Sequence, residues 1–395
     1  MRIANAKDKK RNLLGNLLLL AALLIVLIYI DMTRSSFDII VKVLQKGCVY
    51  AIVAVSMNLL NGFTGLFSLG QAGFMLIGAY VYSVFSVDDA SREMVYSFSG
   101  KPLINFQLPI LLAILLAGIA AALFAFLIGL PVLKLKSDYL AIATLGFAEI
   151  LRTIIQWDKL GPLTNGSFPI SKLNTFKDLL SNGPLRKLSF VMPFFLVAVV
   201  CITIVALMIR STYGRAFKAI RDDEVAAEAM GINLARHKML SFVTSSFFAG
   251  IGGAMYAVFV GSTNAAPFTS AMTYEILLIV VIGGMLLGLI AAVLCIGSIT
   301  GSILASLLYI ASQEWWLRGL DSGTFLGITS PMFRNGFRLV VFSVIIMIFV
   351  LFFRRGIMGD REFSSLGIAR AIAGVPRRVR ALFARRPGKA KEAAK

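Results

Sequence analysis

Long apolar stretches recur along the chain, and they constrain its fold more than any other feature. The first of them, Leu13–Ile30, has eighteen residues, of which only Asn16 is polar. As a helix it is about 27 Å long, close to the thickness of the hydrocarbon layer of a bilayer. Across the chain 58% of residues are hydrophobic and 15% are charged, whereas a soluble domain has roughly 45–50% and 25%. The sequence therefore predicts a polytopic membrane protein, because lipid solvates an apolar surface that water does not.

Hydrophobicity divides the chain into about ten spans, which predicts an all-α transmembrane helix bundle. Leu13–Ile30 is expected to be retained as the first span, because no small-residue cleavage site follows it. Asp138–Ile155 is the weakest span, since it carries Glu149 and Arg152, and Tyr274–Ser312 is long enough for two. The other predicted spans are Lys46–Leu60, Leu69–Val87, Leu108–Leu130, Phe190–Ile209, Leu240–Val260 and Leu339–Phe353.

Positive charge lies next to the apolar spans. The chain carries net +19, of which residues 1–12 supply +4, residues 210–238 supply +2 and residues 354–395 supply +9. The positive-inside rule explains this placement better than binding to nucleic acid does. We therefore do not expect nucleic acid as a partner. Both termini and the loop Arg210–Lys238 are therefore predicted to be cytoplasmic, and the number of spans even. The resulting division is a basic N-terminus, a transmembrane domain over 13–353 and a basic tail.

Two loops are predicted to lie on the opposite, external side. Asp88–Gln107 has net charge −1, as the rule favours, but Gln156–Ser189 has net +3 and is the exception. The latter is rich in Gly, Asn and Pro, which suggests a structured external cap. The three cysteines lie in apolar stretches and match no metal or redox spacing. No catalytic, cofactor-binding or metal-binding residues are expected.

The segment Asn61–Gly78 combines glycines with small polar residues at membrane depth. Five glycines lie between Gly62 and Gly78. Glycine permits either close packing of two helices or a break in one helix, and irregular backbone inside a membrane lies within protein or beside water. Both interpretations stay open. If the break lines a pathway through the membrane, the candidate residues here are Asn58, Asn61, Ser68 and Gln71.

Two further pathway candidates, Thr144 and Glu149, lie in the weak span. Arg152 follows Glu149 by three residues, so a helix places both charges on one face. Charges within a span usually face the protein interior and are often functional. Alternatively, long charged side chains near a helix end extend to the membrane surface. Both explanations stay open for Glu149.

The loop Arg210–Lys238 is more structured than a simple connector requires. After a turn at Gly214, a short amphipathic helix is expected over Arg215–Arg221, and Asp222 or Asp223 can cap a second helix. Gly231 is well placed to end that second helix. Two short helices on the cytoplasmic surface indicate docking of a soluble partner, although helices that lie on the membrane surface are the alternative.

Three passages resemble the permease subunits of branched-chain amino acid ABC importers, namely Ser68–Phe74, Asp138–Phe147 and Gly214–Ile232. The resemblance implies a permease of the bacterial cytoplasmic membrane that carries leucine, isoleucine and valine and performs no covalent chemistry. It further implies pairing with a second permease subunit, two cytoplasmic ATPase subunits beneath them and an extracytoplasmic amino-acid-binding protein.

The third passage is the most specific, because it is similar to the ATPase-docking loop of ABC importers. The importer pattern is Glu-Ala-Ala, three residues and then Gly, and Val225 stands here in the glutamate position. The resemblance implies charged ATPase contacts together with small residues that pack closely in the ATPase groove. The charged residues are Arg215, Arg221, Asp222, Asp223 and Glu224, the closely packing ones are Ala226, Ala227 and Gly231, and Gly214 belongs to the same docking loop.

Another part of the chain, outside these three passages, departs from the family pattern. The family's glycine-rich turn is interrupted here, because eleven apolar residues, Leu286–Ile296, separate Gly283-Gly-Met285 from Gly297. Other transport functions therefore stay open: a urea or amide importer, or a sugar or nucleoside permease. An ion-coupled transporter would need buried ionisable residues, for which only Glu149 and Glu275 are candidates. A membrane-anchored interaction protein that uses the basic tail is the alternative outside transport.

Overall fold

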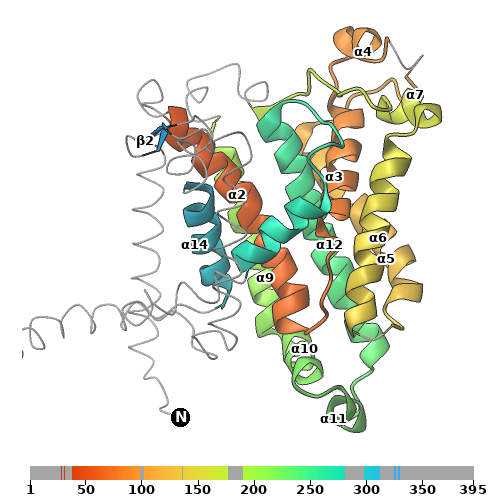
Figure 1. Ribbon diagram of the computed structural model, residues 1–395, viewed down its shortest axis with the longest axis vertical. Coiled ribbons are helices and arrows are strands. Elements are labelled where there is room, and N and C mark those ends of the chain that lie inside the picture. The colour runs from red at the N-terminus through yellow and green to blue at the C-terminus, as the bar shows by residue number, and fades with distance from the viewer. Residues whose placement is uncertain are drawn as a thin grey trace, which may run out of the picture.

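The computed structural model describes residues 38–97, 102–135, 137–176, 190–280 and 298–311, with Ile28, Asp31 and four strand residues. Its helices are α2 (Asp38–Asn58), η2 (Leu59–Phe63), α3 (Gln71–Ser86), α4 (Asp89–Val95), α5 (Ile110–Val132), α6 (Ser137–Ile155), η3 (Asp158–Leu160), α7 (Gly161–Thr164), α9 (Met192–Arg210), α10 (Thr212–Asp222), α11 (Glu224–Ala229), α12 (Leu234–Val260) and α14 (Ser298–Ala311). A further apolar helix runs over Ser270–Val280. The long helices lie side by side as a bundle (Figure 1).

Four described helices are long and apolar enough to cross a bilayer: α2 with η2, α5, α9 and α12. A fifth span results if α6 is counted together with η3 and α7, which follow it after a bend of 63°. The sequence is therefore correct in predicting a helical membrane bundle. The predicted spans Leu13–Ile30, apart from Ile28, and Leu339–Phe353 lie outside the described residues, as do 281–297 and both basic termini.

Several predicted spans differ from the observed helices. α2 begins at Asp38, eight residues before the predicted start at Lys46. α3 has sixteen residues, about 24 Å, because residues 64–70 before it are not helical. The prediction of an all-α chain misses one small feature, an antiparallel pair of two-residue strands, Thr324–Phe325 and Ile328–Thr329.

The core forms around α12, which lies against α2, α3 and α5. Backbones touch between α3 and α12, since a Cβ atom on Gly78 would collide with the carbonyl of Gly250. A Cβ atom on Gly253 would likewise collide with the carbonyl of Met75. Small residues thus allow close helix packing, as is common in membrane bundles. This supports the packing interpretation for the helical part of the glycine-rich segment.

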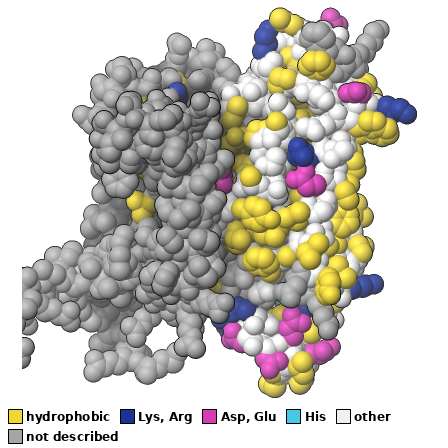
Figure 2. All heavy atoms as spheres, viewed as in Figure 1, with side chains coloured by type: hydrophobic (Ala, Val, Ile, Leu, Met, Phe, Trp, Pro, Cys, Tyr) yellow, Lys and Arg dark blue, Asp and Glu magenta, His cyan; other side chains and the backbone are white. Residues whose placement is uncertain are grey.

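The outer face of α5 is apolar. Its exposed side chains include Leu115, Ile119 and Leu123, and hydrophobic side chains cover much of the middle of the described surface (Figure 2). Such a surface is stable where lipid covers it. Charged side chains gather mainly at the two ends of this view (Figure 2).

One end of the bundle carries a structured cap that contains α4 and α7, while α10 and α11 lie at the other end (Figure 1). Backbone bridges join Val87 to Leu173 and Ile170 to Thr263. The buried Arg92 guanidinium donates to the carbonyls of three residues. These are Val87, Ile104 and Phe106.

Tyr96 adds a neutral hydrogen bond within the cap. Its hydroxyl donates to the carbonyl of Leu163 at 3.1 Å. Burial raises the pKa of Tyr96 to about 12, although Arg92 acts in the opposite direction. The loops 88–107 and 156–189, as far as they are described, therefore share one end, opposite Arg210–Lys238. The membrane side that each end faces stays a prediction.

Candidate functional site

The loop between α9 and α12 contains two helices, as the sequence predicts. The predicted turn at Gly214 is wrong, because Gly214 lies inside α10. The turn instead occurs at Ser211, whose hydroxyl donates to the carbonyl of Met208 at 2.6 Å. Gly214 is needed there because a Cβ atom would collide with the carbonyl of Ile209. The glycine thus lets α10 fold back directly against the end of α9.

Asp223 begins the second helix. Its carboxylate accepts hydrogen bonds from the backbone N–H groups of Val225, at 2.9 Å, and Ala226, at 3.0 Å. This confirms one of the two predicted caps, and Asp222 instead accepts from the guanidinium of Arg221 at 3.0 Å. Gly231 follows α11 with φ +85°, in the left-handed region that favours glycine.

The inner side of the loop is fixed to the bundle. Phe217 and Ile220 of α10 are fully buried, and Ala227 of α11 is also buried. Glu224 pairs with Lys238 at the start of α12, with 2.6 Å between carboxylate and ammonium. Several charged residues that the sequence assigns to a partner therefore also build the loop itself. Their contact with an ATPase stays a prediction.

The outer side of the loop exposes two large apolar side chains that sequence reasoning missed. Val225 is 78% exposed and Met230 is 84% exposed. Apolar residues on the solvent face of an otherwise charged segment could have indicated them. Arg215, Ala226 and Gly231 are exposed as well. We call Val225, Ala226, Met230 and Gly231 the apolar tip.

Gln71 is buried in the bundle core, and its predicted place beside a pathway stays a prediction. It is 2% exposed, and its amide nitrogen donates to the hydroxyls of Ser56 and Ser245, each at 3.0 Å. Ser245 in turn donates to the carbonyl of Ser56 at 2.7 Å. This network joins α2, α3 and α12. Ser56 and Ser245 were not predicted, because hydrophobicity alone does not reveal partners so distant in sequence.

The other polar candidates organise the non-helical segment before α3. The Asn61 side chain accepts from the backbone N–H of Ser68 at 3.2 Å. The Thr144 hydroxyl accepts from the backbone N–H of Leu69 at 3.0 Å, which fixes the segment to α6. Asn58 is buried and lies against Gly62. Backbone that is irregular at membrane depth is thus stabilised by side chains of the same chain.

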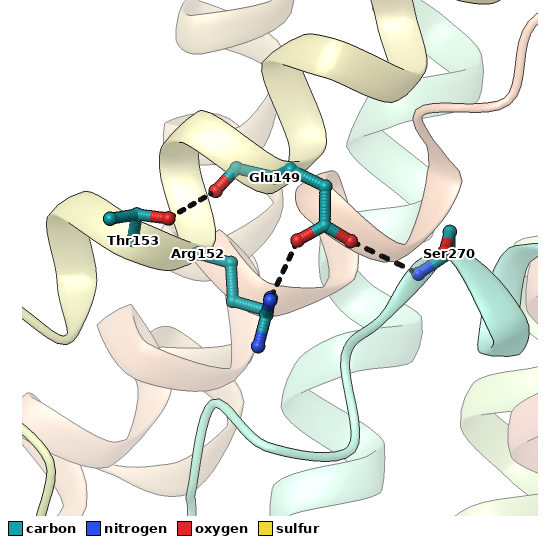
Figure 3. A network of polar contacts seen from close by, with 4 residues as sticks. All are labelled: Glu149, Arg152, Thr153 and Ser270. Atoms are coloured by element: carbon teal, nitrogen blue, oxygen red, sulfur yellow. Dashed lines mark hydrogen bonds and ion pairs between the residues drawn. The ribbon is translucent and has the colours of Figure 1, made fainter.

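Glu149 joins α6 to the start of the helix Ser270–Val280 (Figure 3). Its carboxylate pairs with the Arg152 guanidinium at 2.8 Å and accepts from the backbone N–H of Ser270 at 3.4 Å. The side chains of Glu149 and Arg152 are 36% and 29% exposed. The two charges therefore share a face, as predicted, and neutralise each other. Among the described residues, no group of three His, Cys, Asp or Glu side chains could hold a metal ion.

Comparison with known protein families identifies the family to which the chain belongs. The sequence model described as "Branched-chain amino acid transport system / permease component" matches residues 39–352. The chain belongs to this family. The matched region includes the bundle, the glycine-rich segment and the loop Arg210–Lys238.

The chain is similar to proteins that are named as permeases, among them the following three. The chain is 30% identical over 288 residues to the high-affinity branched-chain amino acid transport system permease protein LivM of Escherichia coli (strain K12), covering 67% of this chain and 61% of the relative. The protein of the same name in Salmonella typhimurium is 32% identical over 304 residues, covering 71% and 64%. The nucleoside ABC transporter permease protein NupC of Lactococcus lactis subsp. cremoris is 27% identical over 205 residues, covering 49% and 59%.

The chain thus spans less than two thirds of the length of the two LivM relatives. No solved structure matches the chain.

Proposed function

We propose that the chain is a permease subunit of an ATP-driven importer of branched-chain amino acids. The observation that carries the proposal is the loop between α9 and α12, whose inner side is bound to the bundle and whose apolar tip is exposed. An exposed apolar surface on a short, well-ordered loop is typical of a protein contact. In this proposal, the tip enters a groove on a cytoplasmic ATPase subunit, with Arg215 and the charges around it at the rim.

The complete transporter would contain two permeases, two ATPase subunits and an external binding protein. This chain would cross the cytoplasmic membrane about ten times with both termini inside, and the cap would face outward toward the binding protein. ATP binding would move the loop, and the bundle would alternate between two arrangements that different partners stabilise. The residues near the pathway would be Asn58, Asn61, Ser68, Gln71, Thr144 and Glu149. Of these, Asn61 and Thr144 hold the irregular backbone before α3, and Gln71 joins α2, α3 and α12.

The substrate is the least specific part of the proposal. The names of the LivM relatives favour branched-chain amino acids, and the few charges of the bundle suit an apolar cargo. A nucleoside is the second candidate, because the Lactococcus relative is a nucleoside permease. An ion-coupled mechanism is less well supported, since Glu149 already has Arg152 as its partner.

The decisive experiment is purification of the tagged chain from native membranes in mild detergent. We expect an ATPase and a second permease to co-purify, and the complex to import labelled leucine into proteoliposomes when ATP and the binding protein are supplied. Uptake of labelled uridine in place of leucine would favour the nucleoside candidate. Uptake that needs an ion gradient and no ATP would refute the importer proposal.

A further inference from the structure

The π-helical turn η2, which ends the α2 span, contacts α10 of the loop Arg210–Lys238, which we call the docking loop after its proposed function. π-helical turns are rare and are frequent at functional sites. The Arg221 guanidinium of α10 donates to the carbonyl of Gly62 at 3.2 Å. The Lys218 ammonium lies 5.6 Å from the centroid of the Phe63 ring, a favourable cation–π distance. Two basic side chains of α10 therefore bind this irregular turn.

Gly65 brings the backbones of the turn and the loop into contact. Its φ of +75° is in the left-handed region, and a Cβ atom there would lie 2.9 Å from Cγ and 3.3 Å from Cα of Arg221. Any other residue would be strained in this conformation and would push α10 away. Movement of α10 and movement of the turn are therefore tied together by direct contact.

The other side of the turn is joined to α6. The Asn61 side chain accepts from the backbone N–H of Ser68, and the backbone N–H of Leu69 donates to the Thr144 hydroxyl of α6. A Cβ atom on Gly70 would lie 3.0 Å from the carbonyl oxygen of Thr144. A continuous chain of contacts thus runs from α10 through the turn to α6.

We propose that Arg221 is a positioning residue that transmits movement of the docking loop into the bundle at Gly62–Gly65. The inference rests on the proposed function, but it gives Arg221 a different role from the ATPase contact that the resemblance implies. The apolar tip on α11 meets the partner, whereas Arg221 and Lys218 face the bundle. Loss of Arg221 should therefore leave docking intact and impair the coupling of ATP hydrolysis to transport.

The test compares Arg221→Ala and Arg221→Lys in the complete transporter. We expect Arg221→Ala to retain wild-type amounts of co-purified ATPase and to continue hydrolysing ATP, while leucine uptake per ATP falls about tenfold or more. Arg221→Lys should restore part of the uptake, since an ammonium can still reach the Gly62 carbonyl. Lys134→Ala, an exposed basic residue that follows α5 at the same end, serves as the matched control and should keep normal uptake.

A second measurement uses the chain alone in detergent and is independent of the importer proposal. Hydrogen exchange of the backbone at residues 62–70 should be faster in Arg221→Ala than in the wild type, with exchange in α11 unchanged. Unchanged exchange in this turn would overturn the inference even if the chain proves not to be an importer. Normal uptake per ATP in Arg221→Ala would overturn it too, and so would loss of the co-purified ATPase, which would make Arg221 a docking contact.

Discussion

Individual charged residues of the docking loop show how the same sequence pattern can serve two purposes. Asp223 caps α11, and Glu224 pairs with Lys238. The resemblance to importer permeases implies that these charged residues contact the partner. It does not distinguish them from Val225 and Met230, which are the most exposed large apolar side chains of the loop. That distinction depends on the rotation of α11, which the cap at Asp223 sets.

Gly231 offers a test of docking with an internal control. Gly231 and Gly261 both have positive φ, +85° and +75°, and a Cβ atom on either would meet nothing within 4 Å. Replacement by leucine should therefore cost about 1 kcal/mol of backbone strain at each position. Only Gly231 lies at the apolar tip, whereas Gly261 ends α12 at the opposite end.

Gly231→Leu should consequently abolish most ATP-driven uptake and ATPase co-purification. Gly261→Leu should keep both at more than half of the wild-type level. Both variants are compared with the wild type by immunoblot of membranes, uptake of labelled leucine and recovery of the ATPase. Equal behaviour of the two variants would count against a docking role for the tip.

The cap at Asp223 leads to a second prediction for a single residue. Asp223→Ala removes the acceptor for two N–H groups and should destabilise α11 by about 1 kcal/mol, whereas Asp223→Asn keeps an acceptor and should cost much less. Hydrogen exchange over residues 224–229 measures the difference. Asp222→Ala is the control, because Asp222 accepts from Arg221 and does not cap α11. Faster exchange in Asp222→Ala than in Asp223→Ala would contradict this assignment.

At the scale of helices, hydrophobicity predicts where most elements lie but not how they meet. The stretches around α5, α9 and α12 are predicted within a few residues, because length and apolarity define a span. The short α3 is predicted too long, since the preceding backbone is compatible with helix in sequence but is bound elsewhere. The N–H group of Leu69 donates to Thr144, and that of Gly70 donates to the Ser68 hydroxyl. The core network of Gln71 with Ser56 and Ser245 joins helices far apart in the chain, so no local pattern reveals it.

Close packing of α3 and α12 gives a prediction for this scale. Gly253→Ala should force these helices apart, because the new Cβ atom would collide with the Met75 carbonyl. Overpacking of this kind costs about 1–3 kcal/mol. Gly146→Ala on α6 is the control, because its Cβ atom would meet nothing within 4 Å, and alanine favours helix by about 1 kcal/mol over glycine.

Thermal unfolding of the purified chain in detergent should therefore show a lower midpoint for Gly253→Ala and an equal or higher one for Gly146→Ala. A midpoint for Gly253→Ala at or above that of the wild type would show that the two helices separate without cost.

For the whole molecule, the arrangement of charged ends around an apolar middle determines how it must sit in a membrane. The cap and the docking loop lie at opposite ends of the bundle, and α5 between them presents an apolar outer face. The positive-inside rule predicts which end faces the cytoplasm, although the net charge of Gln156–Ser189 opposes that prediction. In the described part of that segment, residues 156–176, folded contacts fix the backbone, such as the hydrogen bond from Tyr96 to the Leu163 carbonyl and the bridge between Ile170 and Thr263.

Labelling of single cysteines tests this orientation. Replacing all three native cysteines by alanine gives a chain without thiols as the background. Two of the three, Cys48 and Cys201, are buried. In cells that express the chain without its partners, Phe168→Cys in the cap should react with a membrane-impermeant maleimide added outside. Met230→Cys should react only in inside-out vesicles. Leu115→Cys on the lipid-facing side of α5 should react in neither. Labelling of Phe168→Cys and Met230→Cys from the same side would exclude the proposed topology, because the two ends of one bundle cannot then face opposite sides of the membrane.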